Sequence, residues 1–296
     1  MRKKIFEIIV IGTSLLLAGC GSRGEVKRDA SGKQVLSGYI TLSGAFALYP
    51  LAIQWADEFH RLHPDVDIDI SAGGAGKGIT DVLADQVDIA MVSRELKPQE
   101  KEKGALAYAV AKDAVVATIN ANNPVYRKLL QAGLSQKQAT AIWEGKTKMN
   151  VYTRSDACGA AETWAAFLGK KQEDLKGTGV FGDPGVAETL QKDVNGIGFN
   201  NIGYAYNDKT HKPTKGIAIV PIDVNGNGKL DAEEKFYDTL DELMDAIAKG
   251  KYPAPPARNL YLVTAGKPKN PVVVEFLKYV RTKGQRLNAP AGFVHI

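Results

Sequence analysis

The sequence predicts an α/β protein with two lobes, each a mixed, mostly parallel sheet flanked by helices. The chain has 296 residues, 44% hydrophobic and 24% charged, which is enough for two separate cores. Apolar strand-like runs alternate with amphipathic helix-like runs, which is typical of parallel sheets. Three prolines between residues 251 and 258 suit a crossing of the chain from one lobe to the other.

The expected elements follow this alternation in order. Strands are predicted in the short apolar runs 37–42, 66–70, 87–92, 114–120, 217–222 and 260–264. Helices are predicted in the runs 48–63, 79–86, 135–145, 160–168, 239–249 and 272–283. Because run 114–120 leaves the first lobe and run 260–264 returns to it, we expect lobe 1 to comprise residues 37–113 and 258–296, and lobe 2 residues 114–257.

The first residues have the features of an export signal. A positive start is followed by an apolar run, and Leu17-Ala18-Gly19-Cys20 resembles a bacterial lipobox. We therefore expect a lipoprotein signal peptide at 1–19, lipidation of Cys20, and a polar tether at 20–36. The mature protein would then be extracytoplasmic and attached to a bacterial membrane only through this lipid.

Charge and cysteine content exclude some partners. The net charge is +5, and no basic stripe with interleaved aromatic residues is present, so nucleic acid is not an expected partner. The chain has two cysteines. If Cys20 carries lipid, Cys158 has no intramolecular partner and is a single free thiol in an exported protein. We expect a monomer.

Three glycine-rich segments each precede a predicted helix. They are residues 43–47, 73–78 and 154–159, and the last contains Arg154 and Asp156. A helix start offers unpaired N–H groups and a partial positive charge, and an arginine adds a fixed fork of donors. This pattern predicts one converging anion site. The alternatives are that the glycines serve only turns, and that Arg154 and Asp156 form a structural ion pair.

The order of these motifs carries a resemblance. Segments 44–50 and 74–79, segment 87–90 followed by Ser93-Arg94, and Arg154-Ser155-Asp156 with Gly159 resemble the four ligand loops of the periplasmic phosphate-binding proteins of ABC importers. The likeness covers residues 37–296 and implies their two-lobed type II fold. It implies these ligand positions: Ala45, Phe46, Ala47, Ala75, Gly76, Ser93, Arg94, Arg154, Cys158, Gly159 and Ala160.

The same resemblance implies a role. The protein is expected to capture inorganic phosphate, or a similar tetrahedral oxyanion, between its lobes and to deliver it to an ABC importer permease. No reaction is expected. The chain departs from the family where hydroxyl donors are usual, because Phe46, Ala75, Cys158 and Ala160 occupy those positions, and Ser93 replaces an aspartate. These departures motivate the alternative of another anion or a sensor.

An enzyme is the less favoured alternative. Cys158 precedes a predicted helix, and a helix start can lower a thiol pKa enough for nucleophilic attack. A nucleophile also needs a base, and no histidine lies near Cys158 in the sequence. We keep a Cys158-dependent hydrolase as this alternative.

Residues 223–234 match a calcium-binding loop. Oxygen-bearing residues stand at its first, third, fifth, ninth and twelfth positions, glycine stands at the sixth, and a backbone carbonyl suffices at the seventh. The predicted ligands are Asp223, Asn225, Asn227, Lys229, Asp231 and Glu234. We expect a structural calcium ion here. The alternative is an Asn- and Gly-rich surface turn.

Overall fold

The computed structural model describes residues 24–28, 31–32 and 34–296. The predicted signal peptide and Cys20 lie outside the described residues. Among the helices of this described part, none is both long and apolar enough to cross a membrane.

Ten strands are linked by hydrogen bonds in the order β1-β2-β4-β10-β5-β8-β6-β7, with β3 beside β2 and β9 beside β5. The strands are β1 Glu25–Arg28, β2 Gln34–Gly44, β3 Val66–Ala72, β4 Ile89–Val92, β5 Ala105–Asn120, β6 Asn150–Arg154, β7 Thr178–Val180, β8 Gly196–Asn201, β9 Ile217–Val220 and β10 Ala257–Ala265.

Helices fill most of the connections between these strands. The α-helices are α1 Tyr49–Leu62, α2 Ala75–Leu83, α3 Pro98–Glu102, α4 Tyr126–Ala132, α5 Gln136–Trp143, α6 Gly159–Phe167, α7 Gly182–Lys192, α8 Ile202–Ala205, α9 Leu240–Ala248 and α10 Pro271–Val280. The 3-10 helices are η1 Phe46–Leu48, η2 Gln172–Asp174, η3 Ala232–Glu234 and η4 Lys283–Leu287.

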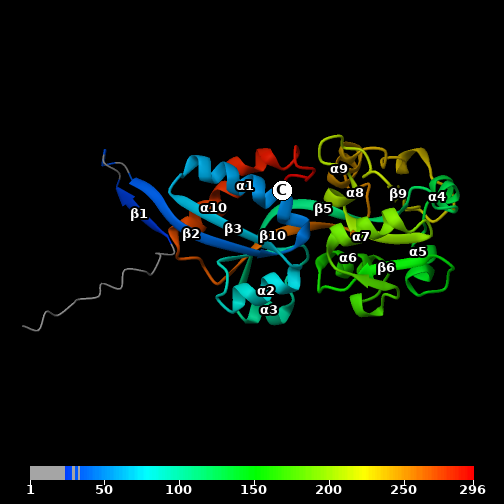
Figure 1. Cartoon of the computed structure of the whole chain (residues 1–296), viewed down its shortest axis with the longest axis horizontal. Helices are drawn as coiled ribbons and strands as arrows, with labels where there is room; N and C mark the ends of the chain where they lie inside the picture. The colour runs from blue at the N-terminus through cyan, green and yellow to red at the C-terminus, as the bar shows by residue number, and fades with distance from the viewer. Residues whose placement is uncertain (1–23, 29–30, 33) are drawn as a thin grey trace, which may run out of the picture.

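Lobe 1 is built on β2, with β3 and β4 parallel to it on either side. Strand β10 continues the sheet antiparallel to β4. Helices α1 and α10 cover one face of this sheet, and α2 and α3 lie on the other (Figure 1). The core contains Trp55 and Phe59, which are fully buried.

Lobe 2 repeats the mixed arrangement. Strands β7, β6 and β8 are parallel, and β5 runs antiparallel to β8 and to β9. Its core gathers Trp143, Trp164 and Phe199, all fully buried and in mutual ring contact. Helix α5 begins as expected, because Ser135 caps it by accepting the Gln138 N–H.

The two lobes share β5 and β10. The first half of β5 supplies Val110 and Ala111 to the lobe 1 core, and the second half supplies Val115 and Val116 to the lobe 2 core. Strand β10 pairs with β5 from Ala105 to Ala114 (Figure 1). The predicted fold class, two lobes each with a mixed sheet and flanking helices, is confirmed.

The structure differs from the prediction at two places in the N-terminal part of the described chain. The expected tether, 20–36, contains β1 and the beginning of β2, because Glu25–Arg28 pairs antiparallel with Gln34–Ser37 in a hairpin. Helix α2 begins at Ala75, inside the predicted glycine loop. Gly78 permits this, since a Cβ there would lie 2.6 Å from the Ser43 carbonyl oxygen.

The aromatic core of lobe 2 generates a stability prediction. Phe199→Ala removes a fully buried ring between two tryptophans, so we expect the free energy of unfolding to fall by about 3–5 kcal/mol in urea titrations. The matched control is Phe181→Ala, which removes a ring that is 60% exposed and should change stability by about 0.5 kcal/mol or less. Equal losses in the two variants would contradict this account of the core.

Candidate functional site

The predicted ligand loops meet where the lobes touch. The Gly76 N–H of lobe 1 donates to the Ala157 carbonyl of lobe 2 at 3.0 Å. A Cβ on Gly159 would lie 2.3 Å from the Ser93 carbonyl oxygen, so only glycine allows this approach of α6 to lobe 1. The segments around Ala75, Ser93 and Arg154 are therefore brought together at one interface.

Arg154 is the centre of this interface. It ends β6, and its side chain is 1% exposed. Asp156 binds it bidentately, with Nε to Oδ1 at 2.8 Å and Nη2 to Oδ2 at 2.7 Å. Asp183 accepts from Nη1 at 2.6 Å. Three of the five guanidinium N–H groups thus bind carboxylates, so two N–H groups remain for a ligand.

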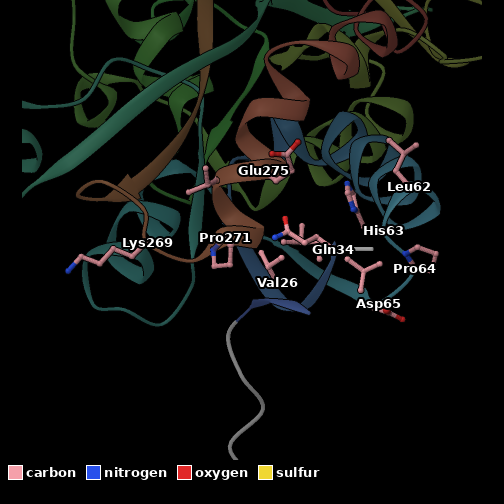
Figure 2. Close-up of a pocket in the computed structure, with 12 residues that line it drawn as sticks. Val26, Gln34, Leu62, His63, Pro64, Asp65, Lys269, Pro271 and Glu275 are labelled. Atoms are coloured by element: carbon pink, nitrogen blue, oxygen red, sulfur yellow. The ribbon is translucent and has the colours of Figure 1, made fainter. Parts of the chain in front are cut away.

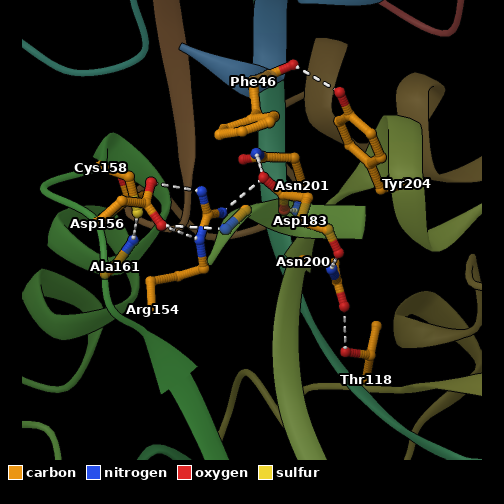
Figure 3. A network of polar contacts seen from close by, with 12 residues as sticks. Phe46, Thr118, Arg154, Asp156, Cys158, Ala161, Asp183, Asn200, Asn201 and Tyr204 are labelled. Atoms are coloured by element: carbon orange, nitrogen blue, oxygen red, sulfur yellow. Dashed lines mark hydrogen bonds and ion pairs between the residues drawn. The ribbon is translucent and has the colours of Figure 1, made fainter. Parts of the chain in front are cut away.

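Asp183 joins Arg154 to a second buried network (Figure 3). It lies at the start of α7 and accepts the backbone N–H and side-chain amide of Asn201 at 2.8 and 2.7 Å. Asn201 in turn accepts from Arg258, which Asp113 binds through Nε at 2.9 Å. Arg154 and Asn201 end the parallel strands β6 and β8, so both side chains emerge at the same edge of the sheet.

This network contains two guanidiniums and three carboxylates, and each of the five side chains is at most 7% exposed. Burial by itself lowers the pKa of Arg154, but the surrounding carboxylates, Asp183 foremost, raise it above the ordinary arginine value. Burial raises the pKa of Asp113, and Arg258 opposes that rise. An anion entering this site meets an arginine whose charge is already balanced.

Phe46 covers the same guanidinium. Its ring centroid lies 5.4 Å from Arg154 Cζ, and it meets the Phe181 ring edge-on at 5.6 Å. The Phe46 carbonyl accepts the Tyr204 hydroxyl at 3.1 Å (Figure 3). Phe46 belongs to lobe 1 and its three contacts to lobe 2, so this aromatic group joins the lobes.

The other predicted ligand residues have different surroundings. The Ala45 N–H donates to the Met91 carbonyl, whereas Ala47, Ala75 and Ala160 are buried at helix starts. Arg94 binds Glu100 at 2.7 Å and Glu162, from α6, at 3.1 Å. Among the described residues, its guanidinium forms no hydrogen bond or ion pair with the Arg154 network.

Cys158 caps α6, and its sulfur accepts the Ala161 N–H at 3.4 Å. The side chain is 4% exposed, and burial, against the attraction of Arg154, raises the thiol pKa to about 12. The thiol is therefore protonated near neutral pH. This opposes the expectation that the helix start activates Cys158 as a nucleophile.

Cavities open at the rim of the interface and elsewhere. One cavity, of about 780 Å³, is lined by Arg154 and Ser155 and by three lysines, Lys97, Lys170 and Lys171. Another, of about 660 Å³, lies beside the β1–β2 hairpin at the outer end of lobe 1, where Val26, His63 and Glu275 point into it (Figure 2). The first cavity opens beside Arg154, and its lining includes Glu162 and Glu173 as well as the lysines.

The predicted calcium loop is held by hydrogen bonds from its own backbone N–H groups to its acidic side chains. Asp223 accepts N–H groups from Gly226 and Gly228, both at 2.8 Å. Glu234 accepts from Val224 at 2.8 Å and from Asp231 at 3.0 Å. Within the described ranges, His, Cys, Asp and Glu side chains form no group of three able to hold a metal ion.

The predicted ligand positions do not include Asp183, Asn201, Tyr204 and Arg258. A signal for Asp183 was present, because Gly182-Asp183-Pro184 is a further glycine-containing helix start of the kind used for the other loops. The remaining three come from segments without such a motif, and only the packing of the lobes brings them near Arg154.

Comparisons with known proteins agree with this architecture. The family model of the PBP superfamily domain matches residues 29–283. The phosphate-binding protein PstS of Bacillus subtilis is 25% identical over 227 residues, 70% of this chain and 73% of that protein. PstS of Pseudomonas aeruginosa is 27% identical over 297 residues, 88% of this chain and 83% of that protein.

A solved structure shows the same fold. The putative phosphate ABC transporter substrate-binding protein of Clostridium perfringens superposes with a TM-score of 0.71 at 21% identity, covering 88% of this chain and 100% of that chain. The fold, the family model and the sequence relatives confirm the resemblance inferred from the loops. The chain therefore belongs to the PBP superfamily and is a PstS-like protein.

Proposed function

We propose that this protein is a receptor that captures inorganic phosphate, or a similar oxyanion, between its lobes for an ABC importer. The observation that carries the proposal is Arg154, a buried guanidinium between two lobes, with two N–H groups beyond those that Asp156 and Asp183 occupy. Relatives named as phosphate-binding proteins support the ligand. They are binding proteins, which supports the absence of catalysis.

The finer parts of the proposal rest on the sequence. Leu17-Ala18-Gly19-Cys20 supports lipidation of Cys20 and an extracytoplasmic location, with the membrane reached only through that lipid. We propose a monomer whose protein partner is the importer permease. A role as a sensor of another anion is the second candidate, favoured by the ring of Phe46 and the methyl group of Ala75 where hydroxyl donors are expected.

Isothermal titration with phosphate, sulfate and other oxyanions tests the ligand. A five-atom ion gains at most about 7.5 kcal/mol by the usual limit per heavy atom, so we expect a dissociation constant of ~3 μM or weaker. Arg154→Lys keeps the charge but loses the fork, and should weaken binding by about 1.5–3 kcal/mol. Arg94→Lys is the matched control and should change the affinity less, because Glu100 and Glu162 hold that side chain.

Two results would contradict the proposal. Absence of heat for every oxyanion at concentrations of ~1 mM or more would argue for another ligand class. Unchanged affinity in a folded Arg154→Lys protein would remove Arg154 from the site.

The pKa of Cys158 separates a receptor from a hydrolase. At pH 8 a thiol with a pKa of about 12 is almost wholly protonated, so iodoacetamide should alkylate Cys158 on the order of 1000-fold more slowly than in the guanidinium-unfolded chain. The measurement uses a Cys20→Ser background and mass spectrometry. Equally fast labelling in the folded protein would support the alternative that Cys158 is a nucleophile.

We also propose a structural calcium ion in loop 223–234, supported by its sequence pattern. Asp223 and Glu234 keep lone pairs for the metal beside the N–H groups that they accept. Calcium at 100 times its dissociation constant should stabilise the fold by about 2.7 kcal/mol, seen as a higher Tm. Glu234→Gln should abolish most of the rise, and a melting curve insensitive to calcium and to EDTA would exclude the site.

A further inference from the structure

The ring of Phe46 occupies the approach to Arg154. It stands 5.4 Å from the guanidinium carbon, on the face that neither Asp156 nor Asp183 uses (Figure 3). An aromatic face attracts the cation through its negative π density, but it offers no hydrogen-bond donor. A bare oxyanion needs donors on several sides, and the π face repels its charge. An oxyanion on the two remaining N–H groups of Arg154 would therefore lie beside this π face, which weakens its binding.

Lobe 2 holds the ring in this place. The Tyr204 hydroxyl donates to the Phe46 carbonyl, and Phe181 supports the ring edge-on. Gly182 leaves room for it, since a Cβ there would lie 3.1 Å from the Phe46 ring. Because these contacts all join the two lobes, Phe46 lies on Arg154 when the lobes are together.

We propose that Phe46 is a specificity-determining residue of this site, which lowers the affinity for a bare tetrahedral oxyanion by stacking on Arg154. The inference rests on the proposed function, since it concerns the same site. The phenylalanine in the first loop would then select against ions that bind weakly to the remaining donors of Arg154. A ligand must either displace the ring or supply enough hydrogen bonds to outweigh it.

Titrations of three variants test the proposal. Phe46→Ala removes the ring, Phe46→Ser also adds a hydroxyl donor, and Phe46→Leu keeps apolar bulk but removes the π face. A cation–π contact corresponds to about a 3- to 30-fold change in an equilibrium constant, so phosphate should bind that much more tightly to Phe46→Ala, and more tightly still to Phe46→Ser. Phe46→Leu should fall between wild type and Phe46→Ala. Tyr39→Ala, which removes a 47% exposed ring that takes no part in these contacts, is the control and should leave the affinity unchanged.

The outcomes separate this inference from the proposed function. If wild type binds phosphate and neither Phe46→Ala nor Phe46→Ser binds it more tightly, the inference is wrong and the receptor function stands. If wild type and all variants ignore every oxyanion, both are wrong. If the Phe46 variants gain affinity and Tyr39→Ala does not, both are supported.

A measurement on the wild-type protein does not depend on the variants folding. The Arg154 side-chain protons lie over the Phe46 ring, so their NMR signals should be shifted upfield by the ring current. Saturating phosphate should change this shift, because the ion either displaces the ring or binds beside it. Phosphate binding that leaves the shift unchanged would show that the ion and the ring do not affect each other, and would overturn the inference.

Discussion

The structure depends on the pairing of one buried charge. Arg154 is almost fully enclosed, and a guanidinium in that position is tolerated only when carboxylates accept its N–H groups. Asp156 comes from the same loop, whereas Asp183 comes from the start of α7 and brings Asn201 with it. The requirement to pair Arg154 thus determines how β6, β7, β8 and α7 are arranged at the lobe 2 edge. Loss of either carboxylate would leave buried N–H groups of Arg154 without their acceptor at the point where the lobes meet.

The strands that join the lobes place this edge opposite lobe 1. Strand β5 belongs to both cores, and β10 pairs with it at the crossing. Arg258 and Asp113 sit on these two strands and reach Asn201, so the crossing itself takes part in the polar network. A movement of the lobes about β5 and β10 would change the distance from this network to the glycine loops of lobe 1. The site and the connection between the lobes are therefore mechanically linked.

Direct contacts between the lobes explain why the structure shows them touching. Gly76 donates to Ala157, Gly159 lies against Ser93, and Tyr204 donates to Phe46. These are short-range contacts that need glycine, or a side chain of one size, at each position. They hold the lobes together. The same contacts place the ring of Phe46 on Arg154, which makes the arginine part of the interface as well as a candidate ligand.

The sequence by itself determined the fold class, the order of most elements and the central residue of the site. Alternating apolar runs are local signals, and Ser135 at a helix start or Arg154 beside Asp156 can be recognised within a few residues. Only the tertiary structure decided which carboxylates share Arg154, that Arg94 turns to Glu100 and Glu162, and that burial raises the Cys158 pKa. It also decided that residues 25–28 form a strand, because β2 offers them a partner. The physical reason is the same in each case: pairing and desolvation depend on groups that are distant in the chain, and no local pattern records them.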